Sequence, residues 1–158
     1  MDPINRKIKQ AAVTLAFALA VAGPAAAAGE SHEHGHAAGE AKLVLDHGKK
    51  WQTDAPLRQG MENIRAVVAR DVKAIHANKA TEKQYEALAA KVNGEVAYIV
   101  QNCKLPEDAD AQLHLVIAEL LAGAEAMKGE HPREGAEQVA KALNQYGQFF
   151  SHPGWKKL

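Results

Sequence analysis

The chain has 158 residues, 47% of them hydrophobic, and a formal net charge of zero. That length suffices for one domain with a hydrophobic core and is short for two. The basic residues form no run that could neutralise a series of phosphates, so nucleic acid is not expected as a partner.

The N-terminus has the features of a secretory signal peptide. Three basic residues precede an apolar run over residues 11–22, and alanines at 26–28 provide small residues for cleavage. The run is shorter than the roughly 20 residues that cross a bilayer, so no stable membrane insertion is expected after cleavage. We therefore expect residues 1–28 to be removed and the mature chain, with a net charge of −2, to be periplasmic.

Residues 29–54 are predicted to form a flexible histidine-containing leader and an anchoring segment. His32, His34 and His36 alternate in a polar tract that should be disordered without a ligand. Alternating imidazoles on a flexible tether suit a borderline metal such as copper, nickel or zinc, although a solvated polar leader explains them equally well. Trp51 is the expected anchor of the segment that follows.

Four amphipathic helices are predicted over residues 55–151. Thr53 or Asp54 offers an N-cap for the first, and the capping box that begins at Thr81 starts the second. Pro106 separates the second from the third, and the break that ends at Pro132 precedes the fourth. The apolar stripes, with spacings of three and four, contain Leu57, Met61, Ile64, Val68, Val72 and Ile75; Tyr85, Leu88, Val92, Val96, Ile99 and Cys103; Leu113, Ile117, Leu120, Ala124 and Met127; and Ala136, Val139, Leu143, Tyr146 and Phe150.

The short loops between these helices favour antiparallel neighbours. The predicted fold is therefore an all-α, antiparallel up-down-up-down four-helix bundle, followed by a C-terminal tail at residues 152–158. In this order the starts of the first and third helices share one end of the bundle with the ends of the second and fourth.

That shared end is expected to gather Met61, Cys103 and His114. A thioether, a thiolate and an imidazole form a soft ligand set that suits copper, particularly Cu(I). Each residue also has a simpler explanation. Met61 and Cys103 lie on apolar stripes and can fill the core, whereas His114 can hydrogen-bond to neighbouring backbone.

Cys103 is the only cysteine, so it has no partner for an internal disulfide in an exported chain. It is expected to be buried, to bridge two chains in a homodimer, or to bind a metal ion. The sequence contains no C-x-x-C-H motif, which excludes covalent attachment of a c-type haem.

The opening of the first predicted helix, APLRQGMENI over residues 55–64, matches a known pattern in its Leu, Met, Glu and final apolar residue. It resembles the soluble b-type four-helix cytochromes of the bacterial periplasm. The resemblance implies an exported bundle, and in that family the methionine at the position of Met61 is an axial haem ligand.

The family's other axial ligand is a histidine directly after an Asn-x-Tyr near the end of the fourth helix. Asn144 and Tyr146 match this pattern, but the next residue is Gly147. Noncovalent haem would therefore require His114 or His152 as a replacement ligand.

The leading hypothesis is a small periplasmic metal-binding protein, most simply for copper, that acts in sequestration or delivery. A noncovalent haem-binding electron-transfer bundle and a cofactor-free structural or interaction bundle are the alternatives. An enzyme is not expected. The sequence has no paired carboxylates beside an apolar stripe, no phosphate-binding glycine loop and no recognisable Ser/His/Asp arrangement.

Export can be tested directly. Because the small residues that precede Gly29 suit signal peptidase, the mature protein should begin near Gly29 when its intact mass is measured after periplasmic extraction. An intact N-terminus at Met1 in that fraction would contradict the prediction.

Overall fold

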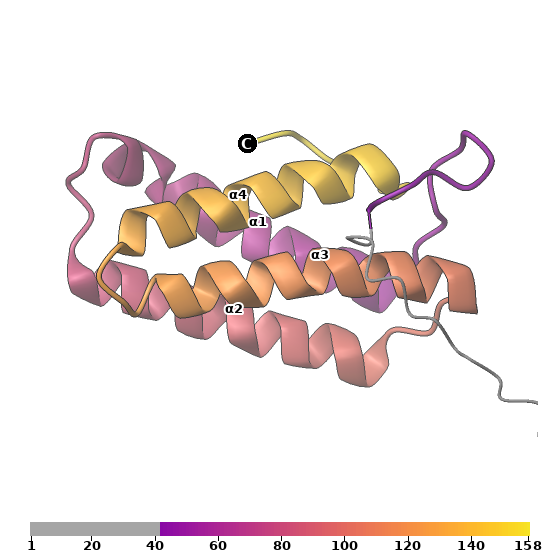
Figure 1. The fold of residues 1–158 in the computed structure, drawn as a ribbon, viewed down its shortest axis with the longest axis horizontal. Helices are drawn as coiled ribbons and strands as arrows, with labels where there is room; N and C mark the ends of the chain where they lie inside the picture. Colours follow the sequence, from indigo (N-terminus) through magenta and orange to yellow (C-terminus); the bar gives the residue numbers. More distant parts are fainter. Residues whose placement is uncertain (1–41) are drawn as a thin grey trace, which may run out of the picture. The chain divides into compact units, whose positions relative to one another are not determined.

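A computed structural model describes residues 42–158, so the predictions for the signal peptide and for His32, His34 and His36 lie outside the described residues. Four helices build the domain: α1 (Ala55–His76), α2 (Glu82–Asn102), α3 (Glu107–Ala126) and α4 (Pro132–Phe149) (Figure 1). Over residues 42–158 the only β-type pairings are isolated bridges. The predicted all-α four-helix fold is thereby confirmed. No helix in this part of the chain is both long enough and apolar enough to cross a membrane.

The helices begin where their capping residues predict. Asp54 is the N-cap of α1, and its side chain accepts a hydrogen bond of 2.9 Å from the Leu57 amide. Thr81 and Gln84 form the expected reciprocal capping box of α2. The first turn of α3 is acidic, and its negative charges interact favourably with the positive end of the helix dipole.

The predicted stripes form the core between the helices, with Val72 and Cys103 only partly buried. The helix pairs α1/α2 and α3/α4 are antiparallel. Along α1 and α2, a Cβ at Gly60 would lie 2.5 Å from the Ile99 side chain. One turn further along α1, Asn63 hydrogen-bonds to Glu95. The up-down-up-down order of all four helices stays a prediction.

Glycine also permits the close packing of α3 on α4. A Cβ at Gly135 would lie 2.6 Å from the Gly123 carbonyl oxygen, too close for a stable contact. The two backbones can therefore approach at this crossing only because both positions lack a side chain.

The segment before α1 is attached to the end of α4. The Trp51 amide donates to the Phe149 carbonyl, and the Ser151 amide donates to the Trp51 carbonyl, both at 2.8 Å. The Trp51 indole also donates to the Val44 carbonyl at 2.7 Å. Trp51 therefore ties the segment that precedes α1 to the C-terminal end of α4.

Truncation of a core leucine tests the assignment of helix faces. Leu120 is fully buried, so Leu120→Ala should lower the free energy of unfolding by about 2–5 kcal/mol through lost burial and a residual cavity. The matched control is Leu121→Ala at the neighbouring position, which is 41% exposed. This change should lower the free energy of unfolding by less than about 1 kcal/mol. Urea unfolding followed by circular dichroism measures both, and equal effects would contradict the assignment.

Candidate functional site

Cys103 lies where the N-terminal end of α1 meets the C-terminal end of α2. It is the partly buried C-cap of α2, and its amide donates to the Ile99 carbonyl at 2.8 Å. Its neighbour in space is Asp54, which hydrogen-bonds to the thiol. The second Asp54 oxygen accepts a bond of 2.7 Å from the Lys104 amide. One carboxylate thus caps α1 and holds the chain that follows α2.

The surroundings of Cys103 oppose its ionisation. Burial, the charge of Asp54, the hydrogen bond from the thiol to Asp54 and the charge of Asp110 together raise the thiol pKa to about 12. Cys103 is therefore a neutral thiol at pH 7. A cation that replaced the thiol proton would be attracted by a thiolate and by two neighbouring carboxylates.

The other two predicted bundle ligands lie in different environments. Met61 is fully buried in the core cluster, against which Cys103 also packs. The His114 side chain is 63% exposed, and its Nδ1 lies 2.9 Å from the Asp110 carbonyl and 3.4 Å from the Asp110 carboxylate. The backbone contact expected of His114 is therefore present. Asp110 is the residue that links the surroundings of His114 and Cys103.

The structure does not by itself assemble a ligand set from ionisable side chains. Within residues 42–158, no three His, Cys, Asp or Glu side chains gather in a way that could hold a metal ion. A copper site here would therefore require the Met61 thioether as a ligand or a change of the His114 rotamer.

An aromatic cluster lies beside this end, where the α4 terminus meets the tail. Tyr146 and Phe150 stack with ring centroids 5.2 Å apart, and Trp155 meets Tyr146 edge-on at 4.9 Å. The Tyr146 hydroxyl lies 3.1 Å from the Nδ1 of His152. Burial is the main cause that lowers the His152 pKa and raises the Tyr146 pKa, so both groups are neutral at pH 7.

The tail places Trp155 against Gly147, the residue at which the resemblance described above would require a histidine. A Cβ at Gly147 would collide with the Trp155 indole. The indole also lies 5.8 Å from the Arg65 guanidinium, and Arg65 donates to the Lys156 carbonyl at 2.6 Å. The Trp155 Nε1 is buried without a hydrogen-bond partner among the described residues, so packing rather than hydrogen bonding holds the ring.

This packing does not fit a porphyrin. Met61 is sealed from solvent, the space beside Tyr146 is filled by Phe150 and Trp155, and Gly147 supplies no ligand. Of the two replacement histidines, His114 is directed to the surface and His152 is bonded to Tyr146. Haem would have to displace the aromatic side chains that complete the core.

Comparisons with protein-family models, with curated proteins and with solved structures find no match for this chain. The likeness to the bundle cytochromes therefore rests on the residues quoted above and on the four-helix fold.

Sequence patterns identified Cys103 but missed the two carboxylates beside it. Asp54 is recognisable as an N-cap, which accounts for only one of its two oxygens. Asp110 is recognisable as an acid near the start of α3. Neither pattern indicates that both charges act on a thiol at the end of α2.

The raised thiol pKa can be tested by alkylation. At pH 8, iodoacetamide should modify Cys103 at least about 100-fold more slowly than free cysteine, because only the thiolate is nucleophilic. Asp54→Asn retains an N-cap but removes the charge that raises the pKa, so it should accelerate the reaction. The control is Glu119→Gln, which removes the charge of an exposed carboxylate on α3. This change should leave the rate of alkylation unaltered. Wild-type reactivity that rises near pH 9, as for an ordinary thiol, would contradict the assignment.

Proposed function

We propose that this chain is an exported copper-binding protein that acts in metal sequestration or delivery rather than in catalysis. The observation that supports the proposal best is the environment of Cys103. A partly buried thiol lies against the Asp54 carboxylate, with Asp110 close enough to affect its ionisation.

The electrostatics of this group favour a cation in place of the thiol proton. Loss of the proton alone would place a thiolate beside two carboxylates, and this repulsion contributes to the raised pKa. A bound metal cation would offset part of this negative charge and relieve the repulsion. A thiolate selects a soft ion, so Cu(I) is preferred over magnesium or calcium.

Met61 and His114 are the proposed additional ligands in the bundle. Met61 belongs to the buried cluster on which Cys103 packs, and a thioether is a typical ligand of Cu(I). His114 would have to leave the Asp110 carbonyl and rotate towards α2. His32, His34 and His36 are proposed to form a separate, weaker capture site in the leader.

Two alternatives remain distinct from this proposal. Noncovalent haem is disfavoured by the packing of Phe150 and Trp155 around Tyr146. A cofactor-free structural or interaction bundle is favoured by the complete burial of Met61, which needs no metal to explain it. A homodimer bridged through Cys103 would require the partly buried thiol to move away from Asp54.

Copper binding should be measured on the full chain with His32→Ala, His34→Ala and His36→Ala, so that only the bundle site is titrated. Competition with a chromophoric Cu(I) chelator should then reveal one tightly bound equivalent. Cys103→Ser should weaken Cu(I) binding by at least about tenfold and should affect Zn(II) less, because it removes the soft sulfur. Met61→Leu, which nearly conserves volume, and His114→Ala should each weaken Cu(I) binding as well.

The pH dependence follows from the thiol. Because the Cys103 pKa lies far above neutrality, binding should release about one proton, and the apparent affinity should rise about tenfold per pH unit between pH 6 and 8. The control is His76→Ala, an exposed histidine at the far end of α1, which should change neither quantity. Absence of Cu(I) binding in the leader variant would refute the bundle site and favour the cofactor-free alternative.

A further inference from the structure

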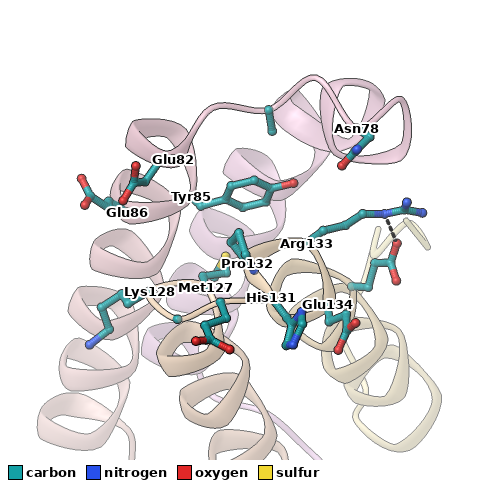
Figure 2. A pocket seen from close by; sticks show the side chains of 14 residues that line it. Asn78, Glu82, Tyr85, Glu86, Met127, Lys128, His131, Pro132, Arg133 and Glu134 are labelled. Carbon is teal, nitrogen blue, oxygen red and sulfur yellow. Dashed lines mark hydrogen bonds and ion pairs between the residues drawn. The ribbon is translucent and has the colours of Figure 1, made fainter.

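A cleft of about 700 Å³ opens at the end of the bundle opposite Cys103, between the start of α2 and the loop that joins α3 to α4 (Figure 2). This volume lies within the range of about 300–1,000 Å³ that is typical of small-molecule sites. Its floor includes Tyr85 and Met127, whose exposed fractions are 4% and 2%. The cleft therefore has an aromatic and apolar base.

The Tyr85 hydroxyl is the polar group of this base, at the tip of a side chain that is otherwise buried. Figure 2 shows the ring crossing the cleft with its hydroxyl directed into the open space. Among the described residues, Tyr146 is the tyrosine whose hydroxyl hydrogen-bonds to a protein group, so that of Tyr85 has no protein partner. A hydroxyl both donates and accepts, and this one can form hydrogen bonds only with what occupies the cleft. The hydroxyl thus marks a position for a ligand atom.

The rim of the cleft carries an excess of negative charge. The two basic residues that line it are already paired, Arg133 with Glu137 at 2.8 Å and Lys128 with Glu125. Four further carboxylates on the rim have no ion-pair partner within residues 42–158. They are Glu82 and Glu86 on α2, Glu130 in the loop and Glu134 on α4.

These charges are spread along the cleft instead of converging on one point. They come from two sides, and no three acidic or histidine side chains in the described part of the chain form a metal-holding group. A single metal ion would satisfy only part of such a rim. A cation whose charges are distributed along an apolar chain would match both the rim and the base.

We propose that this cleft binds a linear aliphatic polyamine. Ammonium groups would pair with the rim carboxylates on both sides, and one ammonium N–H would donate to the Tyr85 hydroxyl oxygen. The methylene groups between them would pack on the Tyr85 ring and on Met127, where a nearby ammonium also gains from the aromatic face.

Isothermal titration calorimetry of the full chain with spermidine, at about 0.15 M salt to screen non-specific attraction, tests the proposal. One saturable equivalent should bind. Tyr85→Phe keeps the ring and removes the hydroxyl, so it should weaken binding about 2- to 12-fold, the value of one hydrogen bond. Glu82→Gln with Glu86→Gln should weaken binding more strongly, because both remove a charge-assisted contact.

The matched control for net charge is Glu107→Gln with Asp108→Asn. Like Glu82, these residues lie in the first turn of a helix, here α3, and they do not line the cleft. The pair should leave spermidine affinity unchanged, and thermal melts should show that all variants fold. No saturable binding to the wild-type chain, or equal losses in the two double variants, would overturn the proposal.

A second measurement locates the ligand. In ¹H–¹³C spectra of the methionine methyl groups, spermidine should shift the Met127 resonance and leave Met61, buried near the other end, unchanged. Cys103→Ser should not alter spermidine binding, so this result stands or falls independently of copper binding. A Met127 resonance that does not move at saturation would also overturn the assignment.

Discussion

The arrangement of the residues around Cys103 depends on the hydrogen bonds that the Asp54 carboxylate accepts. One oxygen caps α1 through the Leu57 amide, and the other accepts from the Lys104 amide just beyond α2. The same carboxylate raises the pKa of the Cys103 thiol. One side chain therefore caps α1, joins the start of α1 to the end of α2 and raises the pKa of the Cys103 thiol. Each of its two oxygens has a separate backbone partner. Asparagine at this position could maintain the cap but could not maintain the charge.

The aromatic cluster fills the space where the end of α4 meets the C-terminal tail. Phe150 stacks on Tyr146, and Trp155 packs on Gly147. Arg65 on α1 stabilises the position of the tail through its contact with the Trp155 ring and its hydrogen bond to the Lys156 carbonyl.

The two ends of the domain differ in their chemistry, and the apolar core lies between them. Near Cys103, the charges of Asp54 and Asp110 act on a thiol whose proton a soft cation could replace. Around Tyr85, unpaired carboxylates surround an apolar base and a free hydroxyl. We propose a compact soft ion for the first environment and an extended organic cation for the second. Residues such as Leu120, buried in the middle of the bundle, separate the two.

The helices and their buried faces were predictable from the sequence, because caps and apolar spacing act within one or two turns. The Thr81 capping box and the burial of Leu120 and Tyr146 are examples. Cys103, Met61 and His114 could be singled out by their chemistry, but their surroundings could not be predicted. The bond from Lys104 to Asp54 joins residues 50 apart, and the position of Trp155 on Gly147 depends on how the tail folds back. Such contacts depend on how helix ends and loops pack in three dimensions, and local periodicity carries no information about that packing.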